Sequence, residues 1–121
     1  SNTSNKPELK VKYGWQDRSG GVAGNDPEFT KLVTAQVAYI YKNAGNRLEI
    51  IGVGGIKDTE SALEKILAGS KIIQVVSALW TQGPTIAQTI NHGLVNWMDK
   101  NGVKNISDIV GQEASKYYPK K

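Results

Sequence analysis

The fold of this chain is constrained most by residues 50–79, in which apolar runs alternate with glycine-containing turns. The runs 48–53 and 72–76 are mostly apolar and rich in β-branched residues, as expected for strands that are covered on both faces. A segment with helical spacing of its apolar residues separates the two runs. A strand, a helix and a second strand in this order predict one βαβ unit of a parallel sheet.

The connecting helix has sequence signals at both ends. Asp58 or Thr59 can act as its N-cap, and Gly69 can end it with a positive φ. The acidic side chains Asp58 and Glu60 complement the helix dipole in the first turn, which explains them better than an acid/base pair does. The residues of the predicted buried face are Ala62, Leu63, Ile66 and Leu67, whereas Glu64 and Lys65 are assigned to a solvated face.

Two longer helices are predicted on either side of this unit. Asp26-Pro27 opens the first, which ends at residues 43–46, and the second follows Gly83-Pro84. The predicted inward residues are Phe29, Leu32, Val33, Gln36, Val37 and Ile40 in the first helix, and Ile86, Ile90, Leu94, Trp97 and Met98 in the second.

The segments at the two ends of the chain are less regular. Residues 3–26 hold several glycines among polar residues, with extended pieces such as 9–13, so we expect one long connection. Connections of this length usually serve as lids or binding loops. Near the other end, Ser107 should cap a short last helix through Val110.

The length of the chain sets a second constraint. A closed (β/α)8 barrel usually needs about 250 residues, and this chain has 121. Only two strongly apolar strands are legible, and residues 1–5 have the composition of a strand exit with no strand before them. We therefore expect residues 1–121 to form a single α/β unit that is a fragment of a larger fold. Such a unit leaves apolar strand faces uncovered, so we also expect a homo-oligomer or a second polypeptide as partner.

Composition excludes several classes of function. The formal charge of +4 arises from scattered lysines and arginines, and the only basic cluster is Lys116, Lys120 and Lys121, so we expect no nucleic-acid binding. The absence of cysteine excludes disulfides and thiolate-zinc sites, and no metal site is predicted. The sequence has no signal peptide and no apolar run that could span a bilayer, which favours a cytoplasmic location.

The turn after the first strand has the chemistry of an anion site. Gly54 and Gly55 can adopt positive φ, and without side chains they allow a phosphate to approach the backbone N–H groups. Ser77 follows the second strand and brings a hydroxyl and an N–H to the edge where parallel sheets hold ligands. The two strand ends therefore predict a phosphate cradle.

These segments, taken in order, resemble the C-terminal half of dihydroorotate dehydrogenases. The resemblance rests on Ser19-Gly20-Gly21-Val22-Ala23-Gly24, the segment 50–56, the helix 58–70, Gln74-Val75-Val76-Ser77-Ala78-Leu79 and Gly83-Pro84. It implies the C-terminal half of a (β/α)8 TIM barrel with parallel strands. It also implies FMN as cofactor and the oxidation of dihydroorotate to orotate in de novo pyrimidine biosynthesis. The electron acceptor depends on the subclass, and so does association with a membrane.

The resemblance assigns roles to individual positions. The implied contacts to dihydroorotate or orotate are Asn2 and Thr3, and the implied FMN contacts are Ala23, Gly24, Val53, Gly54, Gly55, Val76 and Ser77. Ala23 departs from the serine that is usual at its position, and Ser77 replaces the usual threonine. The family's catalytic base would precede residue 1, so we expect no turnover by the isolated chain. Gly55→Val should abolish FMN binding if this turn holds the phosphate.

Two other functions remain open at this point. The chain could be the phosphate-binding half-barrel of another TIM-barrel enzyme, without flavin, or a non-catalytic fragment that self-associates. His92 has no carboxylate or serine at catalytic spacing and is assigned to the surface or rim. Trp80 could wall the site or could serve packing.

Overall fold

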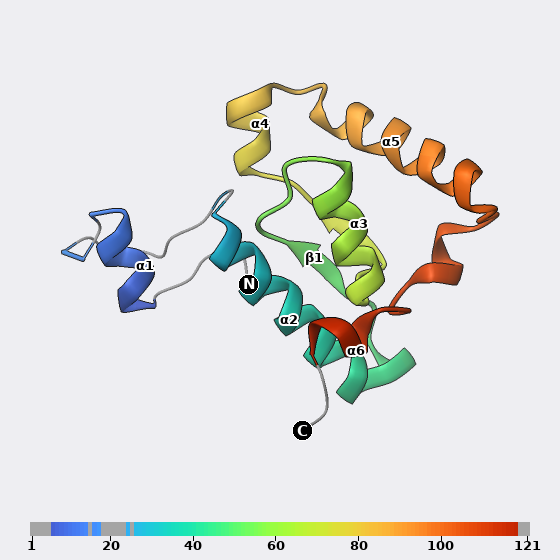
Figure 1. Cartoon of the computed structure of the whole chain (residues 1–121), viewed down its shortest axis with the longest axis horizontal. Helices are drawn as coiled ribbons and strands as arrows, with labels where there is room; N and C mark the ends of the chain where they lie inside the picture. Colours follow the sequence, from blue (N-terminus) through green and yellow to red (C-terminus); the bar gives the residue numbers. More distant parts are fainter. Residues whose placement is uncertain (1–5, 15, 18–23, 25, 119–121) are drawn as a thin grey trace.

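The computed structural model describes residues 6–14, 16–17, 24 and 26–118. They form an α/β unit in which helices surround two short strands (Figure 1). The elements in chain order are α1 (Pro7–Lys12), α2 (Pro27–Ala44), η1 (Gly45–Arg47), β1 (Ile51–Val53), α3 (Thr59–Ala68), β2 (Ile72–Gln74), α4 (Ser77–Gln82), α5 (Ile86–Asn101), η2 (Ile106–Ile109) and α6 (Ala114–Tyr117). None of the helices in this described part is long and apolar enough to cross a membrane.

The two strands are parallel, as the βαβ pattern predicts. Ile51 pairs with Ile72, Gly52 with Ile73 and Val53 with Gln74. The prediction that both strands are covered on both faces is wrong for this chain. Gly52 is buried and Ile73 packs against the core, but Ile51 and Ile72 are more than half exposed. The strands are also shorter than predicted, because the helices of this chain cover only one face of the sheet.

Helix α2 begins where the sequence indicates. The Asp26 side chain accepts hydrogen bonds from the backbone N–H groups of Glu28 and Phe29, and Gly45 follows the last turn with a φ of 57°. The buried face is rotated relative to the prediction: Ile40 and Gln36 are exposed, and the buried residues are Phe29, Val33, Thr34, Val37 and Ala38. The small residue Ala38 and the polar Thr34 are buried because α2 packs closely on both α3 and α6.

Helix α3 has a complete capping box. The Asp58 carboxylate accepts from the Ser61 N–H at 2.8 Å, and the Ser61 hydroxyl oxygen accepts from the Asp58 N–H. Gly69 ends the helix with a φ of 130°. Ala62 and Ile66 are buried and Leu63 and Leu67 are partly buried, as predicted. The assignment of Lys65 to a solvated face is wrong, because its side chain is fully buried.

The main core lies between α3 and α5. Helix α5 contributes Ile86, Ile90 and Leu94 to it, as predicted, and Trp97 packs on it from the edge. Trp97 and Met98 are only partly buried, so their assignment to the core was too strong. The close approach of the two helices depends on Gly93, because a Cβ there would lie 1.9 Å from the Thr59 hydroxyl oxygen.

Four short helical elements differ from the sequence prediction. Residues 7–12, expected to be extended in part, form α1, which Pro7 opens and which buries Leu9 against Phe29 and Val33. Helices α4 and α6 were not predicted; each is six residues or shorter and lacks a side-chain N-cap. The cap of η2 is Asn105 rather than Ser107, because the Asn105 side chain accepts the Ser107 N–H.

The C-terminal segment crosses back over the end of α3. The backbone N–H groups of Gly111 and Glu113 donate to the carbonyls of Ile66 and Leu67 in the last turn of α3, and the Ile66 carbonyl also accepts the Gly69 N–H. The Tyr41 hydroxyl donates to the Val110 carbonyl at 3.1 Å. The segment thereby fixes α6 against α2, as Figure 1 shows.

Candidate functional site

The carboxyl ends of β1 and β2 meet at one edge of the sheet. Because Val53 pairs with Gln74, the glycine turn 54–55 and the segment 75–77 leave this edge side by side. Parallel sheets commonly hold ligands outside the carboxyl ends of their strands. The edge is therefore where the predicted cradle residues of both strands are brought together.

Ser77 and Gly24 also meet at this edge, although they are far apart in the sequence. A Cβ built on Gly24 would lie 3.7 Å from the Ser77 hydroxyl oxygen. Gly24 has a φ of 100°, a conformation that side-chain-bearing residues rarely adopt. Ser77 is half-buried at the start of α4, and Val76 before it is exposed. The structure thus places a hydroxyl group beside Gly24, a residue that carries no side chain.

The glycine turn itself has the backbone that only glycine adopts easily. Gly54 and Gly55 have φ values of 98° and 71°. Gly55 is buried against α2, where an added Cβ would lie 2.3 Å from the Thr30 hydroxyl oxygen and 2.9 Å from its Cα. A Gly55→Val change would therefore displace α2 before it met any ligand, so loss of FMN binding in that variant would not by itself identify the phosphate contact.

The other predicted positions are placed as follows. Val53 is half-buried and ends β1. Asn2, Thr3 and Ala23 lie outside the described residues. His92 is exposed on α5, as predicted, and Trp80 is 89% exposed on α4, so Trp80 does not serve packing among the described residues.

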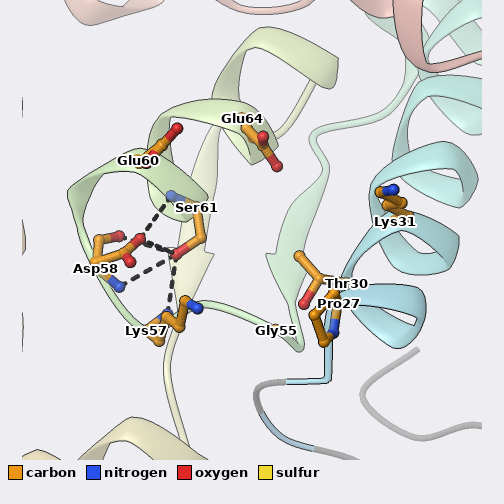
Figure 2. A pocket seen from close by; sticks show the side chains of 9 residues that line it. All are labelled: Pro27, Thr30, Lys31, Gly55, Lys57, Asp58, Glu60, Ser61 and Glu64. Carbon is orange, nitrogen blue, oxygen red and sulfur yellow. Dashed lines mark hydrogen bonds between the residues drawn. The ribbon is translucent and has the colours of Figure 1, made fainter.

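A surface hollow of about 250 Å³ lies beside the glycine turn but does not coincide with the predicted cradle. Figure 2 shows it between the first turns of α2 and α3, with Thr30 lying close to Gly55. Its lining residues are Pro27, Thr30, Lys31, Gly55, Lys57, Asp58, Glu60, Ser61 and Glu64. Positive and negative side chains alternate there, and Asp58 and Ser61 are engaged in the capping box of α3. The hollow offers no concentrated charge to a ligand.

Two functional candidates in this region were missed by sequence reasoning, Thr30 and Lys65. The Lys65 ammonium donates to the Thr34 hydroxyl oxygen at 2.5 Å, and its burial lowers the pKa of Lys65 to about 8. A signal was present in the sequence, because Ser61, Lys65 and Ala68 follow the i, i+4, i+7 spacing of a second buried stripe. The stripe was not recognised because Lys65 is charged, and charged residues are normally assigned to a solvated face.

Asp26 joins α1 to the start of α2. Its Oδ2 accepts from the Lys12 ammonium at 2.6 Å and from the Tyr13 hydroxyl at 2.5 Å, while Oδ1 accepts the two N-cap bonds. The hydrogen bond from Lys12, followed by that from Tyr13, holds the pKa of Asp26 far below its usual range. The same bonds raise the pKa values of Lys12 and Tyr13. This cluster secures both ends of the connection that leads to Gly24.

The residues at the strand ends suit a phosphate group. Glycines with positive φ expose backbone N–H groups, and a serine hydroxyl adds a donor beside them. The Gly24 position, where a side chain would enter the space in front of Ser77, is the feature expected of a cradle that an anion fills. Gly24, Gly54 and Ser77 are therefore the described residues whose chemistry suits a phosphate group, with Gly55 holding the turn against α2.

Comparison with known proteins gives one consistent family. The family profile described as Dihydroorotate dehydrogenase matches residues 1–98. Two similar curated relatives are each named "Dihydroorotate dehydrogenase (quinone)". The one from Deinococcus radiodurans is 38% identical over 97 residues, which cover 80% of this chain and 26% of the relative. The one from Natronomonas pharaonis is 37% identical over 111 residues, or 92% of this chain and 31% of the relative.

Solved structures agree with the sequence relatives. The crystal structure of the ligand-free dihydroorotate dehydrogenase from Eimeria tenella matches with a TM-score of 0.81 and 25% identity, over 93% of this chain and 31% of that one. The same enzyme in complex with ferulenol matches with a TM-score of 0.80. The chain thus spans between about a quarter and a third of the length of the relatives it matches.

Proposed function

The chain belongs to the dihydroorotate dehydrogenase family, and from that membership we propose that it supplies the FMN phosphate-binding part of an enzyme that oxidises dihydroorotate to orotate in pyrimidine biosynthesis. In this proposal the two strands are neighbouring strands of a (β/α)8 barrel. The loops after the last strands of such barrels frequently form a phosphate site. FMN, when bound, accepts the hydride of the oxidation. We further propose a quinone as electron acceptor, because the curated relatives carry that name. A cytoplasmic location, or association with a membrane to reach the quinone, stays a prediction.

The observation that carries the proposal is the convergence of Gly24, the glycine turn and Ser77 at one edge of the sheet. In this arrangement the Ser77 hydroxyl donates to the phosphate, and Gly24 and Gly54 leave room for it. Phosphate contacts of this kind anchor the cofactor and orient its reacting ring from a distance. The substrate contacts proposed for Asn2 and Thr3 lie outside the described residues.

The open face of the sheet supports a proposal about partners. Ile51, Ile72 and Val76 are between 46% and 56% exposed, and a barrel interior requires such a face to be covered. We propose that further barrel strands cover it in the complete enzyme, and that the isolated chain associates with a second copy through this face. We also propose, from the family membership, that the catalytic base belongs to another part of the complete enzyme.

Substitutions at the edge of the sheet test the phosphate assignment in the complete enzyme. Ser77→Ala removes one hydrogen bond to a charged group, which should weaken FMN binding by roughly tenfold or more. Gly24→Val places a branched side chain in front of Ser77 and should abolish binding. Ser107→Ala, which removes an exposed hydroxyl at another helical element, is the matched control. Bound FMN is measured by its absorbance and by titration. Unchanged affinity in both Ser77→Ala and Gly24→Val would contradict the proposal.

A further inference from the structure

The Lys65 side chain is enclosed between α3, α2 and β1. Its relative exposure is 0%. The base of the side chain lies against the strand, since the Lys65 Cβ is 3.4 Å from the position that a Cβ on Gly52 would take. The ammonium lies 2.5 Å from the Thr34 hydroxyl oxygen and 3.4 Å from the Thr30 carbonyl oxygen, both on α2. The charge is therefore held inside the protein, close to the start of α2.

Burial lowers the pKa of Lys65, and the Glu64 carboxylate acts on this buried charge through space and raises the pKa in part, but forms no ion pair with it. In the part of the chain that the structure describes, no carboxylate forms an ion pair with Lys65. Burying an unpaired ammonium costs free energy, and a core of this kind can usually be built from apolar side chains instead. A buried lysine that forms only neutral hydrogen bonds therefore calls for a role that uses its charge.

Thr30 connects the ammonium to the glycine turn. The Thr34 hydroxyl, which accepts from Lys65, donates to the Thr30 carbonyl at 2.9 Å. Thr30 in turn lies against Gly55 so closely that any Cβ there would overlap its side chain and its Cα (Figure 2). Thr30 thus lies between the Lys65 ammonium, which its carbonyl contacts, and the turn that is proposed to adjoin the phosphate.

We propose that Lys65 is a buried electrostatic element of the phosphate site, whose positive charge acts on the anion through the first turns of α2 without touching it. The inference rests on the proposed function. Charge–charge attraction through protein is screened less than through water, so a fixed, buried ammonium acts on an anion that it does not touch. Its hydrogen bonds to Thr30 and Thr34 keep it in place.

Comparing FMN with riboflavin in the complete enzyme separates this role from a purely structural one, because riboflavin lacks the phosphate. Lys65→Met removes the charge, and Lys65→Gln removes the charge but keeps a hydrogen-bond donor for Thr34. In both variants the dissociation constant of FMN should rise about tenfold, from the loss of one charge at moderate distance. The dissociation constant of riboflavin should change less than twofold. Lys65→Gln keeps the test valid if Lys65→Met does not fold.

Two further variants define the controls. Lys65→Arg retains the charge and should retain the preference for FMN over riboflavin. Lys100→Met removes an exposed lysine from the last turn of α5 and controls for net charge. Equal loss of FMN and riboflavin affinity in folded Lys65→Gln would show that Lys65 only holds α3 and α2 together, and would overturn the inference. If the unaltered enzyme bound no flavin, the proposed function would fail instead, so the two failures are distinguishable.

Discussion

The two faces of the β1–β2 sheet differ in how far they are buried. On one face, Gly52 is buried beneath Ser70 and Lys65, and Ile73 joins the core that α3 and α5 complete. On the other face, Ile51 and Ile72 pair side by side and are more than half exposed. These paired residues of both faces are nevertheless apolar, and Gln74 at the end of β2 is the only polar residue in either strand. The difference shows that strand composition alone does not determine burial, because burial of each face of this sheet depends on the helices that pack against it.

The largest effect is expected on the covered face. Ile90 is 1% exposed in the core between α3 and α5. Ile90→Ala should lower the free energy of unfolding by about 2–5 kcal/mol, because it removes buried methyl groups and leaves a cavity. Chemical denaturation monitored by circular dichroism measures this loss. A change below 1 kcal/mol would mean that the covered face is not a packed core.

A second effect on the covered face depends on pH. Burial lowers the pKa of Lys65 to about 8, while in the unfolded chain it is about 10.4. Between these values the unfolded chain binds more protons than the folded one, so stability should rise with pH, by at most about 3 kcal/mol. Below pH 8 both states are protonated and the contribution is constant. Denaturation midpoints measured from pH 7 to 10.5 should show the rise, and Lys65→Met should lack it.

A smaller effect is expected where α1 joins α2. Asp26→Ala removes the N-cap of α2 and the common acceptor of Lys12 and Tyr13, which should cost about 1–2 kcal/mol. Because the pKa of Asp26 is depressed in the folded state, its contribution is present above about pH 4 and is lost as the pH falls further. Hydrogen exchange in residues 7–12 should accelerate in the variant. Unchanged exchange would show that Leu9 alone holds α1.

The smallest effect is expected on the open face. Ile72→Ala should change the free energy of unfolding of the monomer by less than about 0.5 kcal/mol, because the side chain is already 54% exposed. Ile72→Lys should instead abolish self-association, which sedimentation measures. A stable, well-folded monomer of the unaltered chain would contradict the proposed role of this face. If Ile72→Ala lowered the free energy of unfolding as much as Ile90→Ala does, the two faces would not differ in burial as described.

Several features were predictable because their signals are local. The N-caps Asp26 and Asp58 and the helix ends at Gly45 and Gly69 follow from residues within a few positions of each other. The parallel pairing of β1 and β2 follows from the order strand, helix, strand along the chain. Helix α4 could not be predicted in the same way, because it is short and has no side-chain N-cap. The glycine turn was located correctly, but the contact of Gly55 with Thr30 depends on how α2 packs.

The sequence by itself determined the βαβ unit, the two long helices that flank it and the family, because caps, periodicity and an ordered set of motifs are properties of the chain. Only the tertiary structure decided that Lys65 is buried, that Gly24 lies beside Ser77 and that one strand face is open. These three facts depend on which elements come together in space. From sequence alone, a lysine is predicted to be solvated and an apolar strand is predicted to be covered. The packing around each side chain decides whether either prediction holds.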